Sequence, residues 1–429
     1  MTKKSVFAAI TFAAILAGCP SKPKPDGGDA SPIAKNGGDA GAIVSNLDDA
    51  PANPAHGKEL IAQYQCNRCH SGAEQEKPPE NKDCVGCHDN IMQGKFKAPA
   101  DTIAKWKPRV KEYDVAPSLE ATNKRFNRRW VESYLLQPTD LRPHLHQYMP
   151  RLVFTSQQAK DIAAYLVPDV EPSGKSNERS NEAPLAGDLG KGRQLLETKG
   201  CGSCHVMTGV AALPPSSPPA MDPREFDHAH KLAPDLRFAR DRMSTLKMTA
   251  WLKDPKAVKP DSAMPKIALS PEEVKDLVAY LTQVELAPPP KAPPFKRLPP
   301  LDRKVTFKEV DEKVFHRTCW HCHSEPDYAI GDGGPGNSGG FGFKPRGLNL
   351  SDYNGITAGD IDDKGERQSI FQKDDKGVSR LVAALVARHD EEEQNVETGK
   401  VRGMPLGYDP LSPEDIQLVE TWVSQGRPR

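Results

Sequence analysis

Residues 189–205 read LGKGRQLLETKGCGSCH, in which an amphipathic stretch leads directly into the motif Cys201-Gly-Ser-Cys-His205. An amphipathic stretch, a C-x-x-C-H motif and a second amphipathic stretch follow one another in residues 56–168, 188–285 and 309–429. Apolar residues at helical spacing predict amphipathic helices. The sequence therefore predicts a mostly α fold of three small helical domains, and 429 residues are enough for three domains of ordinary size.

The C-x-x-C-H motif occurs four times. Its members are Cys66, Cys69 and His70; Cys84, Cys87 and His88; Cys201, Cys204 and His205; and Cys319, Cys322 and His323. With 9 Cys and 12 His in the chain, composition alone gives on the order of 0.005 chance matches. Two thiols three residues apart lie within one turn, so they can form thioethers to both vinyl groups of one porphyrin while the adjacent His binds the iron. The motifs predict four c-type haems with His70, His88, His205 and His323 as proximal ligands.

The four motifs use every cysteine except Cys19. Disulfides are one alternative in an exported protein, and zinc sites are another. A disulfide does not need a His directly after each second Cys. Closely spaced cysteine pairs in an exported chain suit a zinc site poorly. No thiol remains for a nucleophile, and the sequence predicts no catalytic residue.

Three methionines are candidates for the second axial ligand. Met149, Met264 and Met404 each stand before Pro, downstream of a haem motif and ahead of a closing amphipathic stretch. A low-spin electron carrier needs a sixth iron ligand, and a thioether sulfur favours the reduced iron and raises its potential. The competing interpretation is that each Met fills a hydrophobic core.

The second motif of residues 56–168 lacks such a methionine. It begins only 18 residues after the first motif, so it places a second haem beside the first. His56, His144 and His146 are the candidates for its distal ligand, although each of them, taken singly, is more simply interpreted as a surface residue. The sequence does not choose among them.

The chain resembles class I cytochrome c, in which a helix, C-x-x-C-H, a Pro-x-Leu segment, a Met-Pro loop and a terminal helix follow one another. The matching features of residues 188–285 are Cys201 to His205, Pro234-Asp-Leu236, Trp251, Met264-Pro265 and the stretch from Ser270 to Leu281. The resemblance implies that the carbonyls of Pro117 and Pro234 orient the proximal histidines. It also implies three class I-like cytochrome c domains, the first of which carries two haems.

The N-terminus has the pattern of a bacterial lipoprotein. Residues 1–18 combine Lys3 and Lys4 with a short apolar core, as in a signal peptide. The stretch Leu16-Ala17-Gly18-Cys19 resembles a lipobox, which implies lipidation of Cys19 and attachment to a membrane surface. Pro20, in place of the Asp that retains such lipoproteins at the inner membrane, favours the outer membrane. A plain secretory signal with an incidental Cys is the alternative.

Composition marks the connections between the predicted domains. Residues 19–55 are rich in Gly, Asp, Ala and Pro, which predicts a disordered tether. Residues 169–187 and 286–308 are Pro-rich or polar and predict linkers.

We expect a tetrahaem cytochrome that carries single electrons at the periplasmic face of a bacterial membrane, between a respiratory donor and a terminal acceptor. Its partners would be redox proteins and, through the lipid, the membrane surface. The formal net charge is zero, so nothing indicates nucleic-acid binding. Two alternatives stay open: an enzyme resembling dihaem peroxidases, with catalysis at the haem bound by His88, and a cytochrome subunit of a larger respiratory complex.

Overall fold

The computed structural model describes residues 50–79, 82–111, 113–139, 141–145, 149–150, 152, 154–168, 185–217, 219–288, 295–320, 322–323, 347–362, 364–394, 401–406 and 408–429. Residues 1–18, Cys19, most of the predicted tether, most of the first predicted linker and His146 lie outside this range. None of the helices within it is long and apolar enough to cross a membrane.

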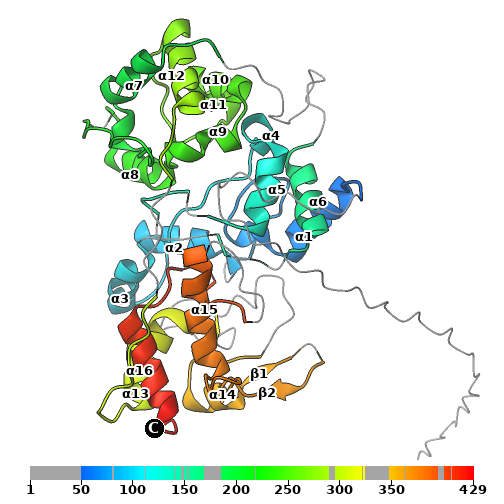
Figure 1. The fold of residues 1–429 in the computed structure, drawn as a ribbon, viewed down its shortest axis with the longest axis vertical. Helices are drawn as coiled ribbons and strands as arrows, with labels where there is room; N and C mark the ends of the chain where they lie inside the picture. Colours follow the sequence, from blue (N-terminus) through cyan, green and yellow to red (C-terminus); the bar gives the residue numbers. More distant parts are fainter. Residues whose placement is uncertain are drawn as a thin grey trace, which may run out of the picture. The chain divides into compact units, whose positions relative to one another are not determined.

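The described residues form mostly α-helices, so the predicted fold class is confirmed (Figure 1). The exception is one antiparallel pair of two-residue strands, β1 (Asp360–Ile361) and β2 (Arg367–Gln368), with Asp360 opposite Gln368.

The first helical group holds two of the four motifs. Its elements are α1 (Pro54–Gln63), η1 (Cys66–Arg68), α2 (Cys84–Met92), α3 (Ala100–Val110), α4 (Thr122–Arg125), α5 (Arg128–Leu136) and α6 (Ser156–Leu166). Helix α1 begins after Asn53, whose side chain accepts hydrogen bonds from two amides of the first turn. Pro54 occupies the first position of the helix, where no backbone N–H is needed. The helix packs against α6 around Leu60 and Ile162, each almost fully buried.

Helices α2 and α3 form a smaller unit within this group. Cys87, Ile91 and Trp106 are its buried residues, and Phe96 meets Trp106 edge-on at 5.6 Å between ring centroids. The second motif therefore has an apolar cluster of its own.

The second helical group repeats the arrangement of α1 and α6. Its elements are α7 (Leu189–Thr198), η3 (Cys201–Ser203), α8 (Pro223–Leu232), η4 (Leu236–Phe238), α9 (Ala239–Arg242), α10 (Thr245–Lys253), α11 (Pro255–Val258) and α12 (Pro271–Gln283). Helix α7 packs against α12, as α1 packs against α6 (Figure 1). Thr155 and Ser270, whose capping signals mark the starts of the closing stretches, each form a capping box, with Gln158 and Glu273 respectively.

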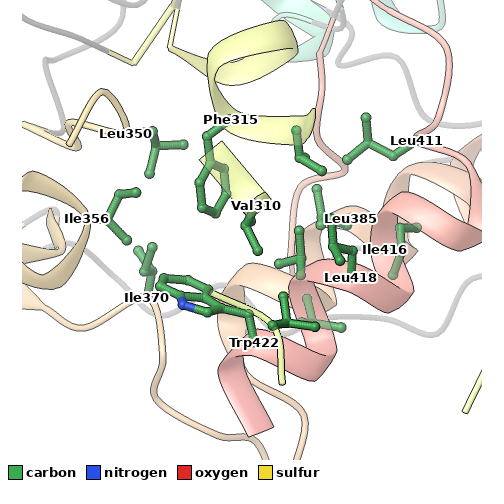
Figure 2. Packing of buried hydrophobic residues seen from close by; sticks show 14 of the residues in the cluster. Val310, Phe315, Leu350, Ile356, Ile370, Leu385, Leu411, Ile416, Leu418 and Trp422 are labelled. Carbon is green, nitrogen blue, oxygen red and sulfur yellow. The ribbon is translucent and has the colours of Figure 1, made fainter. Parts of the chain in front are cut away.

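The third helical group is built around Trp422. Its helices are α13 (Phe307–Val310), the π-helix η5 (Asp311–Cys319), α14 (Tyr353–Ala358), α15 (Arg380–Gln394) and α16 (Pro413–Ser424). Figure 2 shows Trp422 from α16 facing Phe315 from η5, with Ile356 and Ile370 beside them. Residues 295–305 also contact this core, because Phe295 and Leu301 pack against it and Val305 is fully buried.

Main-chain hydrogen bonds join the first and second groups. The amide of Asn127 donates to the carbonyl of Arg242 at 2.8 Å, and the amide of Asp235 donates to the carbonyl of Leu141 at 2.8 Å. Phe126 packs against the hydrophobic clusters of both groups. The segment that precedes α5 therefore lies against the second group.

Candidate cofactor sites

Each C-x-x-C-H motif is folded so that its thiols and imidazole belong to one turn. In the second group, Gly200 has a left-handed φ of 77° that ends α7, and Cys201–Ser203 continue as a 3-10 turn. The amide of His205 then donates to the carbonyl of Cys201 at 2.9 Å. The same bond joins His70 to Cys66 at 2.9 Å and His323 to Cys319 at 3.0 Å.

Two of the motif histidines are oriented by the prolines that the sequence indicated. Nδ1 of His70 donates to the carbonyl of Pro117 at 2.7 Å, and Nδ1 of His205 donates to the carbonyl of Pro234 at 2.8 Å. This confirms the predicted role of both prolines. Burial lowers the pKa of both imidazoles, so each ring is neutral and its Nε2 keeps a lone pair for a metal.

The other two motif histidines use carbonyls that the sequence did not suggest. Nδ1 of His88 donates to the carbonyl of Tyr113 at 2.8 Å, and His323 bonds to the carbonyl of Leu348. Burial also lowers the pKa of these two imidazoles. Any residue offers a main-chain carbonyl, so neither acceptor leaves a signal in the sequence.

One pocket opens beside His70 and another beside His205, and each has a methionine among its lining residues. The first pocket is lined by Cys66, Cys69, His70 and Met149, with walls that include Ile61, Phe126, Trp130, Leu135, Phe154 and Ile162. The second pocket is lined by Cys201, Cys204, His205 and Met264, with walls that include Leu196, Leu236, Met248, Trp251, Leu277 and Leu281. The structure thus brings Met149 and Met264 to the motifs with which the sequence paired them.

The third predicted methionine packs against the same core as one cysteine of its motif. Met404 and Cys319 both pack against the hydrophobic core of the third group, and the amide of Met404 donates to the carbonyl of Ala384 at 2.9 Å. Helix α15, which carries Ala384, therefore fixes the main chain at Met404.

The structure places two of the three candidate distal histidines of the second motif in side-chain contacts. Nδ1 of His56 lies 2.7 Å from Oδ2 of Asp161, across the α1–α6 contact. The ring of His144 stacks on His230, with 3.8 Å between centroids. His146 lies outside the described residues, so it stays a prediction.

The thiols of the motifs sit in apolar surroundings. Burial raises the pKa of Cys66 and Cys319 to about 12 and that of Cys201 to about 11. Such thiols are protonated at neutral pH, whereas zinc binds the thiolate. These three thiols therefore suit thioether formation, which leaves sulfur neutral, better than zinc binding; the pKa of Cys84, in contrast, is lowered by its hydrogen bond with Cys69.

Residues 189–285 match the family model of cytochrome c. These residues are thus similar to cytochrome c, a family whose members bind a c-type haem covalently and transfer electrons. This domain holds the pocket of His205 and Met264, and its apolar walls, paired thiols and neutral imidazole fit that cofactor. No curated protein matches the chain. No solved structure matches it.

The motifs of the first and third groups meet around one tyrosine. The side chains of Cys69 and Cys84 share a hydrogen bond, although they belong to different motifs. Tyr408 interacts electrostatically with both of these thiols and with Cys322. Its ring also meets Tyr113 edge-on, with 5.0 Å between centroids. Sequence reasoning missed this junction because its members are far apart in the chain.

The pockets of His70 and His205 also adjoin each other. Their linings have six residues in common, namely Pro117, Ser118, Arg125, Phe126, Arg142 and Arg242. We call these residues the shared wall. Sequence reasoning missed its arginines, because nothing in the pattern separates them from the many surface Lys and Arg.

Proposed function

We propose that this chain is a tetrahaem c-type cytochrome that passes single electrons between a respiratory donor and a terminal acceptor. The observation that carries the proposal is that the four C-x-x-C-H motifs adjoin one another in space. The His205 pocket shares a wall with the His70 pocket, the side chains of Cys69 and Cys84 are neighbours, and Tyr408 is close to both of them and to Cys322. Separate carriers strung on a chain would not need such contacts.

The contacts give the sites an order that differs from their order in the sequence. The His205 site neighbours the His70 site, which neighbours the His88 site, and the His323 site joins at Tyr408. The two sites at the ends of this series, those of His205 and His323, would be the points where electrons enter and leave.

The chain's own residues supply ligands, burial and orientation, while the iron of each haem carries the electron. We propose His70 with Met149, His205 with Met264 and His323 with Met404 as axial pairs. Each imidazole is held by a main-chain carbonyl, which makes the other ring nitrogen a better ligand. The haem of His88 has His56, His144 and His146 as candidates for its distal ligand.

Intact-mass measurement and a pyridine haemochrome titration of the mature protein test the haem count. Four added haems are expected, and fewer would contradict the proposal. Low-temperature electron paramagnetic resonance would then separate sulfur-ligated, bis-His and high-spin iron. A high-spin signal together with turnover of hydrogen peroxide would favour the peroxidase-like alternative at the His88 site.

Leucine substitutions test the methionine ligands, because Leu and Met have similar volumes and the exchange usually costs less than about 1.5 kcal/mol in a core. Met149→Leu, Met264→Leu and Met404→Leu should each remove one part of the red absorption band of sulfur bound to ferric iron. Met248 is a matched control, because it is buried in the hydrophobic cluster of the second group and lines the same pocket as Met264. Met248→Leu should keep the whole band.

We also propose that lipid on Cys19 holds the protein at the periplasmic face of a bacterial membrane. This rests on the lipobox-like stretch Leu16 to Cys19 and on the apolar core that precedes it. Cys19→Ser should move the protein from the membrane fraction to the soluble periplasmic fraction with its haems retained. Unchanged membrane attachment of this variant would contradict lipidation. Co-purification of the native protein with redox proteins in detergent would identify its partners.

A further inference from the structure

Helix α15 holds two consecutive amides at the proposed ligand Met404. The amide of Gly403 donates to Oε1 of Glu391 at 2.7 Å, and the amide of Met404 donates to the carbonyl of Ala384 at 2.9 Å. The two acceptors are separated by about two helical turns, so they belong to one face of α15. The peptide unit that joins Gly403 to Met404 is therefore fixed against that face.

The same helix also holds the chain beyond Met404. Nε of Arg388 donates to the carbonyl of Tyr408 at 3.2 Å, and Nε2 of His389 donates to the carbonyl of Leu411 at 2.7 Å. Contacts with α15 thus lie on both sides of the methionine in the sequence. A segment held at several points cannot shift as a whole without breaking more than one hydrogen bond.

Glu391 is the member of this contact that the fold buries most closely. The residue is 2% exposed, although Glu is rarely buried unless its oxygens are engaged. Gly403 permits the approach, because a Cβ at that position would lie 2.6 Å from Cα of Arg388 and closer still to the carboxylate of Glu391. The hydrogen bond between Glu391 and Gly403 is therefore shielded from water, which would otherwise compete for the amide.

The side chain of Met404 rests on a core to which α15 also contributes. Met404 and Cys319 both pack against the hydrophobic core of the third group, and Leu385 of α15 is one of its buried members. With its main chain fixed, Met404 can withdraw its sulfur only by side-chain rotation or by movement of the whole segment away from α15. Rotation is hindered where the surroundings are closely packed.

We propose that Glu391 is a positioning residue, whose bond to Gly403 keeps the thioether of Met404 at the iron of the His323 haem and closes that iron to external ligands. The haem and its methionine ligand rest on the function proposed above. When the segment lies against α15, the amide of Gly403 is buried and paired; when the segment swings out, water solvates the amide. The bond therefore stabilises the closed form relative to the open form and opposes ligand exchange.

The experiment is a titration of the ferric holoprotein with imidazole, followed through the red absorption band of sulfur-bound iron. The part of this band that Met404→Leu removes belongs to the haem of His323. In Glu391→Ala, this part should disappear at an imidazole concentration about tenfold lower than in the wild type, because the closed form then contains a buried amide without its acceptor. An unchanged imidazole affinity of this haem would overturn the proposal.

A conservative substitution separates the hydrogen bond from the charge. Glu391→Gln keeps an oxygen that can accept from the amide of Gly403, so its imidazole affinity should stay close to that of the wild type. If Glu391→Gln and Glu391→Ala raised the affinity equally, the charge rather than the hydrogen bond would matter, and the proposal would fail. Intact mass verifies that all variants carry the same number of haems.

Ile356 provides the control for a general loss of stability, because it is fully buried in the same core but lies on α14. Ile356→Val should lower the stability of the third group to urea and leave the imidazole affinity of its haem unchanged. An increase as large as that of Glu391→Ala would mean that any loosening of the core releases Met404, which would contradict a specific role of Glu391.

Hydrogen exchange of the wild type tests the proposal without a substitution. The amides of Gly403 and Met404 should exchange slowly in the ferric holoprotein and faster once imidazole saturates the haems. Equally slow exchange with and without imidazole would show that the segment stays on α15 when the ligand is displaced, and would overturn the proposal. A complete red band in Met404→Leu would instead contradict the ligand pair of the proposed function.

Discussion

The indole N–H of Trp251 donates a hydrogen bond to Sδ of Met264 across 3.0 Å. Trp251 lies on α10, and Met264 lies in the loop between α11 and α12, so the bond fixes the loop to the domain. The amide of Met264 is also held, by Oγ of Ser262 at 3.2 Å. Both the main chain and the sulfur of the proposed ligand are therefore positioned before any iron binds.

Trp251→Phe should lower the midpoint potential of the haem at His205. The N–H group withdraws electron density from the sulfur, so its removal makes the sulfur a better donor to ferric iron and stabilises the oxidised state. Spectroelectrochemical titration measures the shift. Trp130→Phe is the control, since Trp130 lines the other pocket. A potential that stays constant in Trp251→Phe would show that the bond does not act on the iron.

Glycines lie where α1 crosses α6 and where α7 crosses α12, and replacing them should lower the stability of the protein. A Cβ on Gly192 of α7 would lie 2.4 Å from the carbonyl oxygen of Asp276 on α12. Gly192→Ala must separate the helices and should destabilise the domain by about 1–3 kcal/mol. Gly190 lies on the same helix, and the nearest atom to its Cβ would be Oδ1 of Asp188 at 3.3 Å. Gly190→Ala should be neutral or stabilising, by up to about 1 kcal/mol.

Urea denaturation of both variants, with the second group followed through its haem absorbance, checks this prediction. Gly57 of α1 occupies the equivalent position in the first group, because its Cβ would lie 2.0 Å from the carbonyl oxygen of Asp161. Gly57→Ala should show a similar loss. If Gly192→Ala and Gly190→Ala behaved alike, the close crossing would not limit stability.

The features that the sequence predicts here are local. Capping by Thr155 and Ser270 depends on residues three positions away, and the roles of Pro117 and Pro234 come with a short motif. Such interactions leave a fixed spacing in the chain. They specify the mostly α fold, but they do not say which groups of helices touch.

The features that the sequence does not predict are contacts between distant segments. Arg242 and Arg125 look like ordinary charged ends of helices, and only the fold buries both against Phe126. Tyr113 and Leu348 orient histidines through their carbonyls, so their side chains carry no information about this role. The contact of His56 with Asp161, across the α1–α6 crossing, likewise joins residues that are far apart in the chain.

The third group depends on Trp422. Its side chain is fully buried, meets Phe315 edge-on at 5.9 Å between centroids, and donates from Nε1 to the carbonyl of Pro428 at 2.9 Å. Trp422→Ala should cost about 3–5 kcal/mol because it leaves a large cavity and an unpaired carbonyl. Val423 on the same helix only packs against the edge of this core, so Val423→Ala should cost less. Thermal denaturation followed by circular dichroism compares the two, and equal losses would contradict the central place of Trp422.

One surface cluster of the third group makes its stability depend on pH. Glu309 accepts hydrogen bonds from both Nη atoms of Arg303 at 2.7 Å and from Nζ of Lys313 at 2.9 Å. These bonds lower the pKa of Glu309 to about 2. A carboxyl with a lowered pKa stabilises the fold above its unfolded pKa, which is about 4.3 for Glu. This contribution disappears as the pH falls from about 4.3 to about 2.

Arg303→Gln should therefore destabilise the protein only slightly near neutral pH, because the side chains of this pair are partly exposed and screened by water. The difference from wild type should shrink as the pH falls through this window, and urea denaturation at several pH values measures it. Acid also affects the haem ligands, but it does so equally in the wild type and in Arg303→Gln, so this effect cancels when the stabilities of the two are subtracted. Lys308→Gln is the control, because Lys308 lies 3.8 Å from Glu312 and both side chains are largely exposed. A pH-independent difference for Arg303→Gln would mean that Arg303 acts by packing its alkyl chain instead.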